Sequence, residues 1–180
     1  MRRLLRLWSA APLTRKLAAV AMLVAAVFVL WPHEAGQWRV AAVADGDTLR
    51  LLSPAGETVR ARLQFVDAPE LAQAGGPAAR DVLLRLVRSG AIVWRKASTD
   101  AYGRELGSLE VAGEDVALAL LGEGWAWHYR RYAQAEQPAA DYRRYRQAEV
   151  AARQARRGLW VDPAAEPPWR WRQRHRDRRP

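Results

Sequence analysis

The sequence predicts an α+β fold, in which five short β-strands form a small barrel that three helices cover, after an N-terminal hydrophobic helix. Three observations predict this class. Apolar and polar residues alternate in short segments that turn residues separate. Later segments carry apolar residues at helical spacing, and an uncharged apolar run lies near the N-terminus. The 180 residues suffice for one domain of ordinary size with additional terminal segments.

The N-terminal region divides into a basic stretch, residues 1–16, and an apolar stretch, residues 17–31. The apolar stretch has no polar face, so it is not typical of a helix packed against a globular core. It is predicted to be a membrane anchor, with a cleaved signal segment as the alternative. The preceding basic residues predict a cytoplasmic N-terminus. We therefore expect a bacterial inner-membrane protein whose domain is periplasmic, or a secreted one if the segment is cleaved.

Five segments are predicted strands of the barrel. They cover residues 37–44, 47–53, 57–66, 91–96 and 106–111. The third segment alternates most clearly, with Ala61 and Leu63 on one face and Arg62 on the other. The run Ser53-Pro54-Ala55-Gly56 is typical of a turn and separates the second and third strands.

Helices are predicted over Pro77–Ser89, Asp115–Leu121 and Pro138–Arg157. Proline suits the first turn of a helix, Asp115 is a suitable N-cap, and glycine follows each segment. Five strands with helices after the third and the fifth are typical of an OB-fold. The predicted domain spans residues 36–161. The Pro-, Trp- and Arg-rich residues 163–180 are predicted to form a disordered basic tail.

The net charge of +10 does not by itself identify a nucleic-acid-binding domain. Residues 1–31 contribute +5 and residues 170–180 contribute another +5, so the sequence between them is neutral. Any electrostatic argument must therefore rest on where charges lie. The chain has no cysteine, which excludes disulfides, thiolate zinc sites and a cysteine nucleophile.

Three acidic residues are candidates for a metal site. Asp47 begins the second predicted strand and Asp67 ends the third, so adjacent antiparallel strands can bring their carboxylates together. Carboxylates at close range repel unless a cation lies between them, and an oxygen-binding ion such as Ca²⁺ meets that need. Glu70 lies three residues further on, where it can orient or deprotonate a water molecule.

Two arginines are candidates for binding a phosphate. Arg62 precedes Asp67 on the third strand, and Arg104 follows a turn in a separate hairpin. Planar guanidinium groups bind phosphate oxygens in pairs and stabilise negative charge that develops during phosphoryl chemistry. Each of these fragments alone is more often structural than catalytic, since Asp-Gly is a common turn and Tyr-Gly-Arg can be a plain turn.

The order of these fragments resembles the staphylococcal nuclease (thermonuclease) family. The matching motifs, from about Val40 to Trp160, are DGDT, R-x-x-x-x-D-x-P-E, D-x-Y-G-R and R-G-L-W. The resemblance implies an OB-type barrel and Ca²⁺-dependent hydrolysis of DNA and RNA. It implies Asp47 and Asp67 as Ca²⁺ ligands, Glu70 as the base, and Arg62 and Arg104 as contacts to the scissile phosphate. Substrate contacts are implied for Tyr102 and Tyr132. Ala68 stands where the family's best-known member has threonine, a change that a backbone carbonyl ligand tolerates.

The sequence leaves two other functions open. A catalytically inactive OB-fold module that binds nucleic acid or protein at the cell envelope is the main alternative. A structural envelope protein whose basic tail binds anionic lipid or wall polymer would explain the tail but not the acidic residues. The retained acids and arginines favour a nuclease that acts as a monomer on DNA or RNA, with the N-terminal segment as its membrane contact.

Overall fold

A computed structural model describes residues 37–176, and these residues form the predicted α+β fold. The apolar stretch at residues 17–31, predicted to be an anchor or signal, lies outside the described residues. Between residues 37 and 176, no helix combines the length and apolar character needed to cross a membrane.

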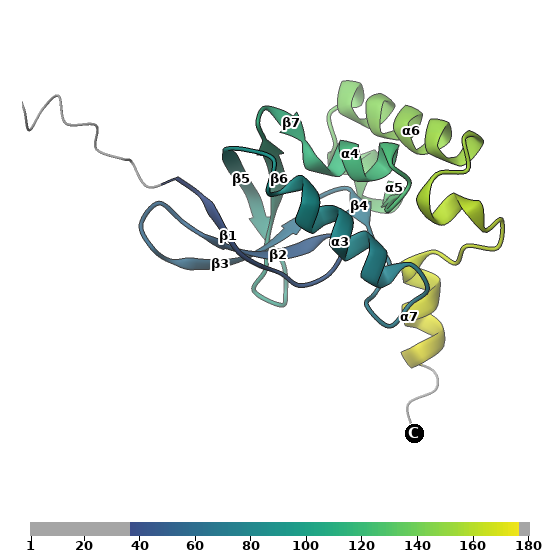
Figure 1. The fold of residues 1–180 in the computed structure, drawn as a ribbon, viewed down its shortest axis with the longest axis horizontal. Coiled ribbons are helices and arrows are strands. Elements are labelled where there is room, and N and C mark those ends of the chain that lie inside the picture. The colour runs from purple at the N-terminus through teal and green to yellow at the C-terminus, as the bar shows by residue number, and fades with distance from the viewer. Residues whose placement is uncertain (1–36, 177–180) are drawn as a thin grey trace, which may run out of the picture. The chain divides into compact units, whose positions relative to one another are not determined.

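Five strands form the main sheet in the order β1-β2-β3-β6-β5 (Figure 1). In that order they span Arg39–Val43, Thr48–Leu52, Thr58–Leu63, Glu105–Val111 and Ile92–Thr99. The first three form an antiparallel meander, as predicted, and β3 then pairs in parallel with β6. A short strand, β7 (Glu114–Asp115), extends the sheet beside β6.

The predicted barrel is not closed. A single bridge between Trp38 and Ile92 joins the β1 and β5 edges, and no ladder of paired residues among those described continues it. After β3 the chain instead leaves the main sheet and forms a separate two-stranded sheet, in which β4 (Val66–Asp67) pairs with β8 (Trp127–His128).

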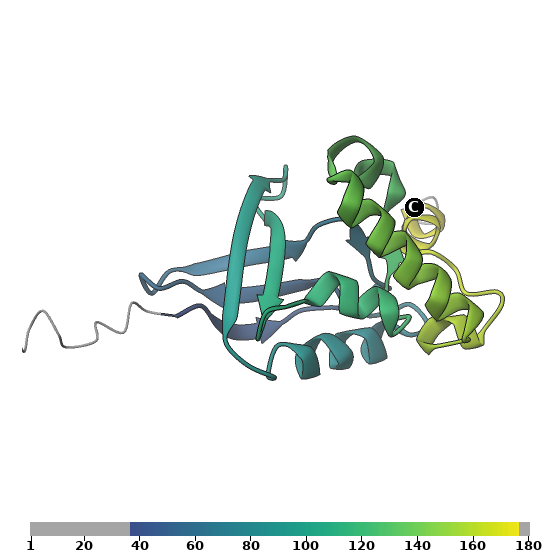
Figure 2. The same ribbon diagram turned by 90° about the horizontal axis from the view of Figure 1, so that it is seen from above.

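The three predicted helices are present, with slightly different bounds. They are α3 (Gly76–Leu86), α4 (Val116–Gly122) and α6 (Ala139–Gln154). Asp115 caps α4 as predicted, because its carboxylate accepts a hydrogen bond from the Leu118 N–H at 3.1 Å. Helix α6 packs on α4, and α4 packs on α3 and β6, so the helices cover the sheet from one side and one end (Figure 2).

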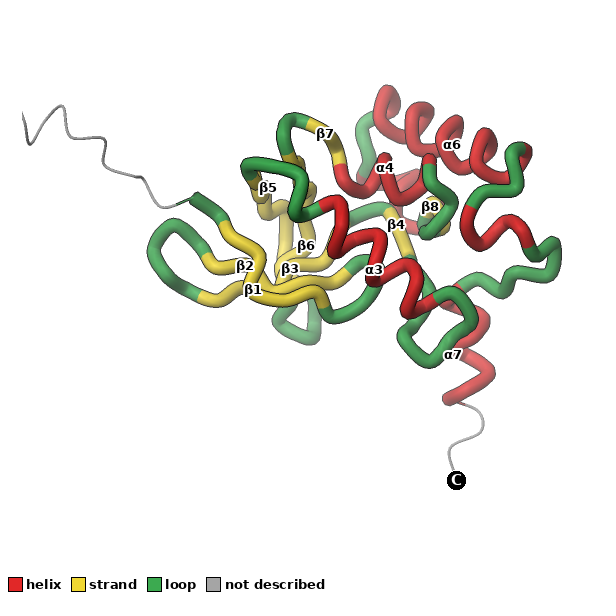
Figure 3. The backbone as a smooth tube through the Cα atoms, viewed as in Figure 1, coloured by secondary structure: helices red, strands yellow, loops and turns green. Residues whose placement is uncertain are grey.

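Two further α-helices, α5 (Arg130–Glu136) and α7 (Pro168–Arg176), were not predicted from the sequence. The prediction of disorder from residue 163 onward is therefore wrong for α7, which Figure 3 shows as the last described helix. It is ordered because it makes contacts that its composition does not reveal. Pro168 is buried, and the Trp169 ring stacks on Tyr129 with 5.6 Å between ring centroids.

The core lies between the sheet and the helices. Strand β2 alternates as expected, with Leu49 and Leu51 buried and Arg50 exposed. The other fully buried large apolar residues come from β3, β4, α3, β6 and α4, namely Leu63, Val66, Leu83, Leu109, Leu120 and Leu121. A second, smaller cluster contains Trp127, Ala152, Leu159 and Trp160. Together they fix the ends of β2, β3 and β4, which carry the candidate site.

Candidate active site

The turn between β1 and β2 fixes the position of Asp47. The Asp45 carboxylate accepts hydrogen bonds from the backbone N–H groups of Asp47 at 3.0 Å and Thr48 at 2.7 Å, which closes the turn. Glycine is needed at position 46, because a Cβ there would lie 2.6 Å from the Cβ of Ala68. This close approach lets the Ala68 N–H donate to Asp47 Oδ2 at 3.0 Å.

A sharp turn between β3 and β4 fixes the position of Asp67. Phe65 has a φ of 63°, in the left-handed region that non-glycine residues seldom adopt. The turn directs β4 away from the main sheet, where Asp67 pairs with Trp127 of β8. The Asp67 side chain is completely buried. Strain of this kind persists only where the surroundings hold it, as they do here.

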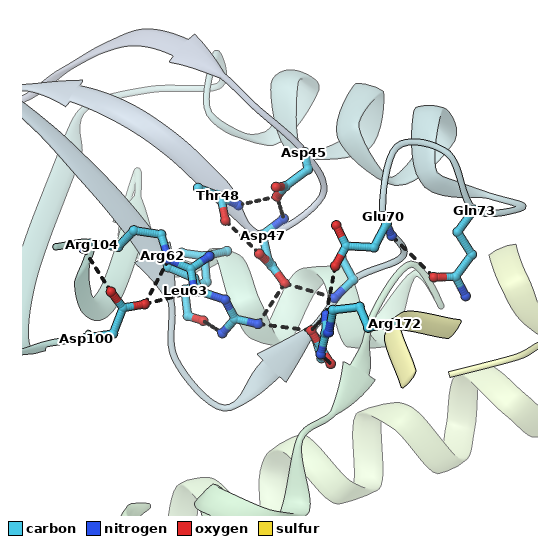
Figure 4. Close-up of polar contacts among 12 residues, drawn as sticks. Asp45, Asp47, Thr48, Arg62, Leu63, Glu70, Gln73, Asp100, Arg104 and Arg172 are labelled. Atoms are coloured by element: carbon cyan, nitrogen blue, oxygen red, sulfur yellow. Dashed lines mark hydrogen bonds and ion pairs between the residues drawn. The ribbon is translucent and has the colours of Figure 1, made fainter. Parts of the chain in front are cut away.

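Arg62 forms ion pairs with both aspartates, and Figure 4 shows its guanidinium group beside Asp47. Its Nη2 is 3.2 Å from Asp47 Oδ2 and 3.0 Å from Asp67 Oδ1, and its Nη1 donates to the Leu63 carbonyl at 3.3 Å. Arg62 pairs with Thr48 in the register of β2 and β3, which places it beside the Asp47 turn. The structure thus brings Asp47 and Asp67 together. The prediction that Asp67 ends the third strand is wrong, because β3 ends at Leu63 and the turn at Phe65 places Asp67 on β4.

A second arginine, Arg172, reaches the same carboxylates from α7. Its Nη1 is 3.1 Å from Asp67 Oδ1 and 2.9 Å from Glu70 Oε1, and its Nη2 is 2.7 Å from Asp67 Oδ2. Asp67 therefore accepts hydrogen bonds from two guanidinium groups. Arg172 was not a candidate from the sequence, because it lies 105 residues from Asp67 in a segment whose composition is typical of disorder.

The loop between β4 and α3 holds Glu70. The Gln73 N–H donates to the Glu70 carbonyl at 2.8 Å, and the Gln73 side-chain oxygen accepts from the Glu70 N–H at 3.3 Å. A Cβ on Gly76 would lie 1.9 Å from the Glu70 carbonyl oxygen, so only glycine permits this loop. The Glu70 side chain is 36% exposed, so solvent water can reach its carboxylate.

Arg104 follows the turn between β5 and β6. The Asp100 carboxylate fixes that turn by accepting from the Tyr102 and Arg104 N–H groups, both at 2.9 Å. Asp100 Oδ2 also lies 2.8 Å from Arg104 Nε and Nη2. In Figure 4 the Arg104–Asp100 pair lies beside Arg62, which agrees with the parallel register of Ala61 with Glu105.

The two tyrosines predicted to contact substrate lie on the surface. Tyr102 is 78% exposed in the β5–β6 turn, where the Arg104 guanidinium carbon lies 5.7 Å from its ring centroid. Tyr132, on α5, is 49% exposed and packs on Tyr129. The ring of Tyr129 also stacks on Trp169 of α7. Among residues 37–176, no hydrogen bond or ion pair links either tyrosine, or Arg104, to the clustered carboxylates.

The carboxylates lie where negative charge is unfavourable. Burial raises the pKa of Asp67, and the charge of Asp47 raises it further, although Arg172 and Arg62 act in the opposite direction. Burial and the charge of Asp47 raise the pKa of Asp45 to about 6. Burial acts to lower the pKa of Arg62, but the charges of Asp47 and Asp67 outweigh it and raise that pKa. The cluster therefore favours additional positive charge.

The donor atoms of this cluster suit Ca²⁺. Carboxylate oxygens are the ligands that this ion prefers, and two guanidinium groups already occupy cation positions next to Asp47, Asp67 and Glu70. In the described part of the chain, no three acidic, histidine or cysteine side chains converge to enclose an ion by themselves. Two carboxylates are nevertheless compatible with Ca²⁺, because its remaining ligands are commonly backbone carbonyls and water.

Sequence reasoning missed Arg172 and the aromatic contacts that hold α7. The Pro167-Pro168 pair is one signal that could have found the helix, since proline is favoured in a first helical turn. The alternation of Trp and Arg after it gives no regular amphipathic face, so the helix and its partner on the domain are not evident from spacing alone.

Comparison with known proteins shows a family to which the sequence is similar. The family model described as "Staphylococcal nuclease homologue" matches residues 60–162. Protein ParB of Escherichia coli is 36% identical over 174 residues, which cover 92% of this chain and 93% of that protein. A micrococcal nuclease of Shigella flexneri is 35% identical over 174 residues, which cover 92% of this chain and 95% of that protein.

A more distant relative, described as an uncharacterized endonuclease of Haemophilus influenzae, is 28% identical over 161 residues. Those residues cover 86% of this chain and 83% of the relative. The family match begins in β3, just before Arg62, and includes Asp67, Glu70 and Arg104, although not Asp47. The match spans more than half of the 180 residues and the similarity to the Shigella nuclease extends over most of both chains, so this chain belongs to the staphylococcal nuclease family.

Proposed function

We propose that the chain is a Ca²⁺-dependent nuclease that hydrolyses phosphodiester bonds of DNA, RNA or both. Its class, a nuclease-type hydrolase, follows from its family and from relatives named micrococcal nuclease and endonuclease. The observation that supports the finer proposal most strongly is that Asp47 and Asp67 both pair with Arg62, while Arg172 joins Glu70 to Asp67.

In the proposed mechanism, Asp47 and Asp67 hold the cation. When bound, Ca²⁺ supplies positive charge that polarises a phosphate oxygen and offsets charge developing in the transition state. Both aspartates are buried and their positions are fixed by turns, so they bind without a large loss of side-chain freedom. Thr48 Oγ1 donates to Asp47 Oδ1 at 2.9 Å, which further orients that carboxylate.

Glu70 acts as the general base. Its carboxylate takes a proton from a water molecule while the water oxygen forms a bond to phosphorus, and the bond from phosphorus to the departing sugar oxygen breaks. That oxygen leaves as a hydroxyl group after taking up a proton from solvent water. The position of Glu70 supports this role, because the side chain lies beside Asp67 and is still partly open to solvent. The Gln73 contacts keep the loop, and hence the base, in place.

Arg62 and Arg104 bind the phosphate and stabilise its additional negative charge in the transition state. Asp100 orients the Arg104 guanidinium group, because its carboxylate pairs with Nε and Nη2 of that arginine. Tyr102 and Tyr132 are proposed to contact the nucleic acid at the edges of the site, where both rings are exposed. Exposed aromatic rings can stack on bases of single strands.

The proposal is tested by incubating the full chain with plasmid DNA and with single-stranded DNA, in Ca²⁺ or in a chelator. We expect cleavage in Ca²⁺ and none in the chelator. A Glu70→Gln preparation purified in the same way controls for contaminating nucleases. Binding of DNA without chelator-sensitive cleavage at any pH would contradict the proposal and favour the alternative, an inactive binding module.

The cellular location is a separate proposal that rests on the apolar residues 17–31 and the basic residues 1–16 before them. We propose that the nuclease domain lies outside the inner membrane, tethered by that stretch or released by cleavage. Cell fractionation with protease treatment of intact spheroplasts tests it. Digestion of the domain in intact spheroplasts, or its release from the cells, is the expected result, and full protection would contradict the proposal.

A further inference from the structure

Helix α7 brings the guanidinium group of Arg172 into contact with Asp67 and Glu70, two of the carboxylates that the proposed mechanism uses. Both oxygens of Asp67 accept hydrogen bonds from Arg172, and one of them also accepts from Arg62. Glu70 Oε1 is held by the same guanidinium group. Since Ca²⁺ must approach its ligand oxygens to about 2.3–2.6 Å, the ion and the Arg172 guanidinium compete for the same oxygen atoms and repel each other.

Apolar packing also holds α7 to the domain. Pro168 is buried, Trp169 packs against the smaller core cluster and stacks on Tyr129 with an angle of 18° between the ring planes, and the Gln73 side chain donates to the Glu166 carbonyl just before the helix at 2.6 Å. The opposite side of the helix is polar and exposed, with Gln173, Arg174 and Arg176 in solvent. Arg172 adds the ion pairs that direct the helix onto the carboxylates.

The segment that leads to α7 allows the helix to leave the site as a unit. Leu159 and Trp160 are anchored in the smaller core cluster, whereas residues 161–164 are exposed. Beyond this exposed connection, Pro168 is buried and Ala165 and Trp169 pack on the outside of that cluster. Release of the helix therefore exposes these three residues, while the buried members of the cluster, Trp127, Ala152, Leu159 and Trp160, all lie before the connection.

We propose that α7 is an intramolecular inhibitor, in which Arg172 occupies Asp67 and Glu70 in the cation-free protein and is displaced when the cation binds. This inference rests on the proposed cation site at Asp47 and Asp67. The closed helix blocks two steps at once, because the same guanidinium group covers a cation ligand and the proposed base. By linkage, the factor by which α7 weakens cation binding equals the factor by which the cation favours release of α7.

The first test measures Ca²⁺ affinity by titration calorimetry on the chelator-treated full chain, without nucleic acid. Arg172→Gln should tighten Ca²⁺ binding about tenfold or more. When only a fraction of the molecules has an open site, the apparent affinity equals the affinity of the open site multiplied by that fraction. Arg170→Gln is the matched control, because it removes the same charge from an exposed position of the same helix. It should change the affinity by less than about twofold, as expected for a screened surface charge. Equal affinities of wild type and Arg172→Gln would overturn the proposal.

The second test uses the unaltered protein and so does not depend on whether the variant folds. Hydrogen exchange of the α7 amides is followed by mass spectrometry with and without saturating Ca²⁺. We expect α7 to exchange about tenfold faster or more in Ca²⁺, while α6 exchanges at an unchanged rate. Unchanged or slower exchange of α7 in Ca²⁺ would overturn the proposal.

An Asp67→Asn variant separates this inference from the proposed function. If Asp67→Asn leaves Ca²⁺ affinity intact, the proposed cation site is wrong and the inhibitor proposal fails with it. If Asp67→Asn weakens binding but Arg172→Gln does not tighten it, only the inhibitor proposal fails. Weaker binding by Asp67→Asn together with tighter binding by Arg172→Gln supports both.

Discussion

Arg62 and Arg172 contact the same carboxylate, Asp67, from regions that differ in how they are held. Arg62 lies within β3, between two paired strands, and its side chain is 13% exposed. Arg172 lies on a terminal helix beyond an exposed connection, and its side chain is 36% exposed. The first arginine is thus part of the sheet, while the second is brought to the site by a segment that can leave it.

This difference indicates how one acidic cluster can serve two states. Three carboxylates and one fixed guanidinium leave a surplus of negative charge, which either Arg172 or a divalent cation can offset. The strands fix the carboxylates and therefore the position at which a positive charge is favourable. Helix α7 determines whether Arg172 occupies that position or leaves it open to a cation.

The largest expected effect on catalysis is that of replacing Glu70. This residue is contacted by α7 and not by Arg62. Glu70→Gln should lower kcat by about 10²–10⁴-fold, because it removes the proposed general base without changing the size of the side chain. Single-turnover cleavage of a labelled oligonucleotide measures it. Glu57→Gln, at the exposed end of the β2–β3 turn, is the matched control and should cleave normally. A wild-type rate for Glu70→Gln would show that the base is elsewhere.

A slightly smaller effect is expected for Arg104→Ala, on the side of the site away from α7. It should lower kcat by about 10²–10³-fold, as does loss of one group that stabilises charge in a transition state. Arg95→Ala removes an exposed arginine of the same hairpin that pairs with Glu110 and should have little effect. Circular dichroism should be unchanged in both. If Arg95→Ala matched Arg104→Ala, a general loss of positive charge would explain the result instead.

The stabilities of two variants compare the regions directly. Arg62→Met should lower the free energy of unfolding by about 3–5 kcal/mol, because it leaves Asp47 and Asp67 without the arginine between them. Arg172→Met should lower it by about 1 kcal/mol or less, because Asp67 keeps Arg62 and the lost contact is partly exposed. Urea unfolding in chelator measures both. Equal losses would mean that α7 is as integral to the domain as β3.

The smallest expected effect concerns pH and a residue outside the site. Burial lowers the pKa of His128, whose Nε2 lies 2.9 Å from Gln137 Oε1. The unfolded chain then binds more protons than the folded one below about pH 6.5, so stability falls as pH drops through that value. His128→Gln should lose less stability between about pH 7.5 and 5.5 than the wild type. A parallel loss in both proteins would exclude His128 as the cause.

Much of the sheet region could be predicted because its signals are local. The alternation in residues 57–63 and the Asp45-Gly46 turn define β2, β3 and the position of Asp47. The prediction of a closed barrel was wrong, because only a single bridge, between Trp38 and Ile92, joins the two edges of the described sheet. Closure depends on how strongly the whole sheet curves, and the type of residue at either edge does not reveal that curvature.

The helix region could not be predicted because its order comes from distant contacts. Within residues 163–176, no aromatic stack or ion pair engages Trp169 or Arg172, which instead contact Tyr129 and Asp67. A composition of Pro, Trp and Arg signals low local order unless a folded surface supplies such partners. The β5–β6 turn is an intermediate case, where the motif identified Arg104 but only the register of β3 with β6 places it beside Arg62.

The most direct test of the account is DNA cleavage at stepwise increasing free Ca²⁺ by the wild type and by Asp67→Asn. We predict that the wild-type rate rises from zero to a plateau, and that Asp67→Asn, which keeps the shape but loses the charge of the central carboxylate, stays near zero until far higher Ca²⁺. Cleavage by Asp67→Asn with the wild-type dependence on Ca²⁺ would contradict the assignment of this cluster as the cation site.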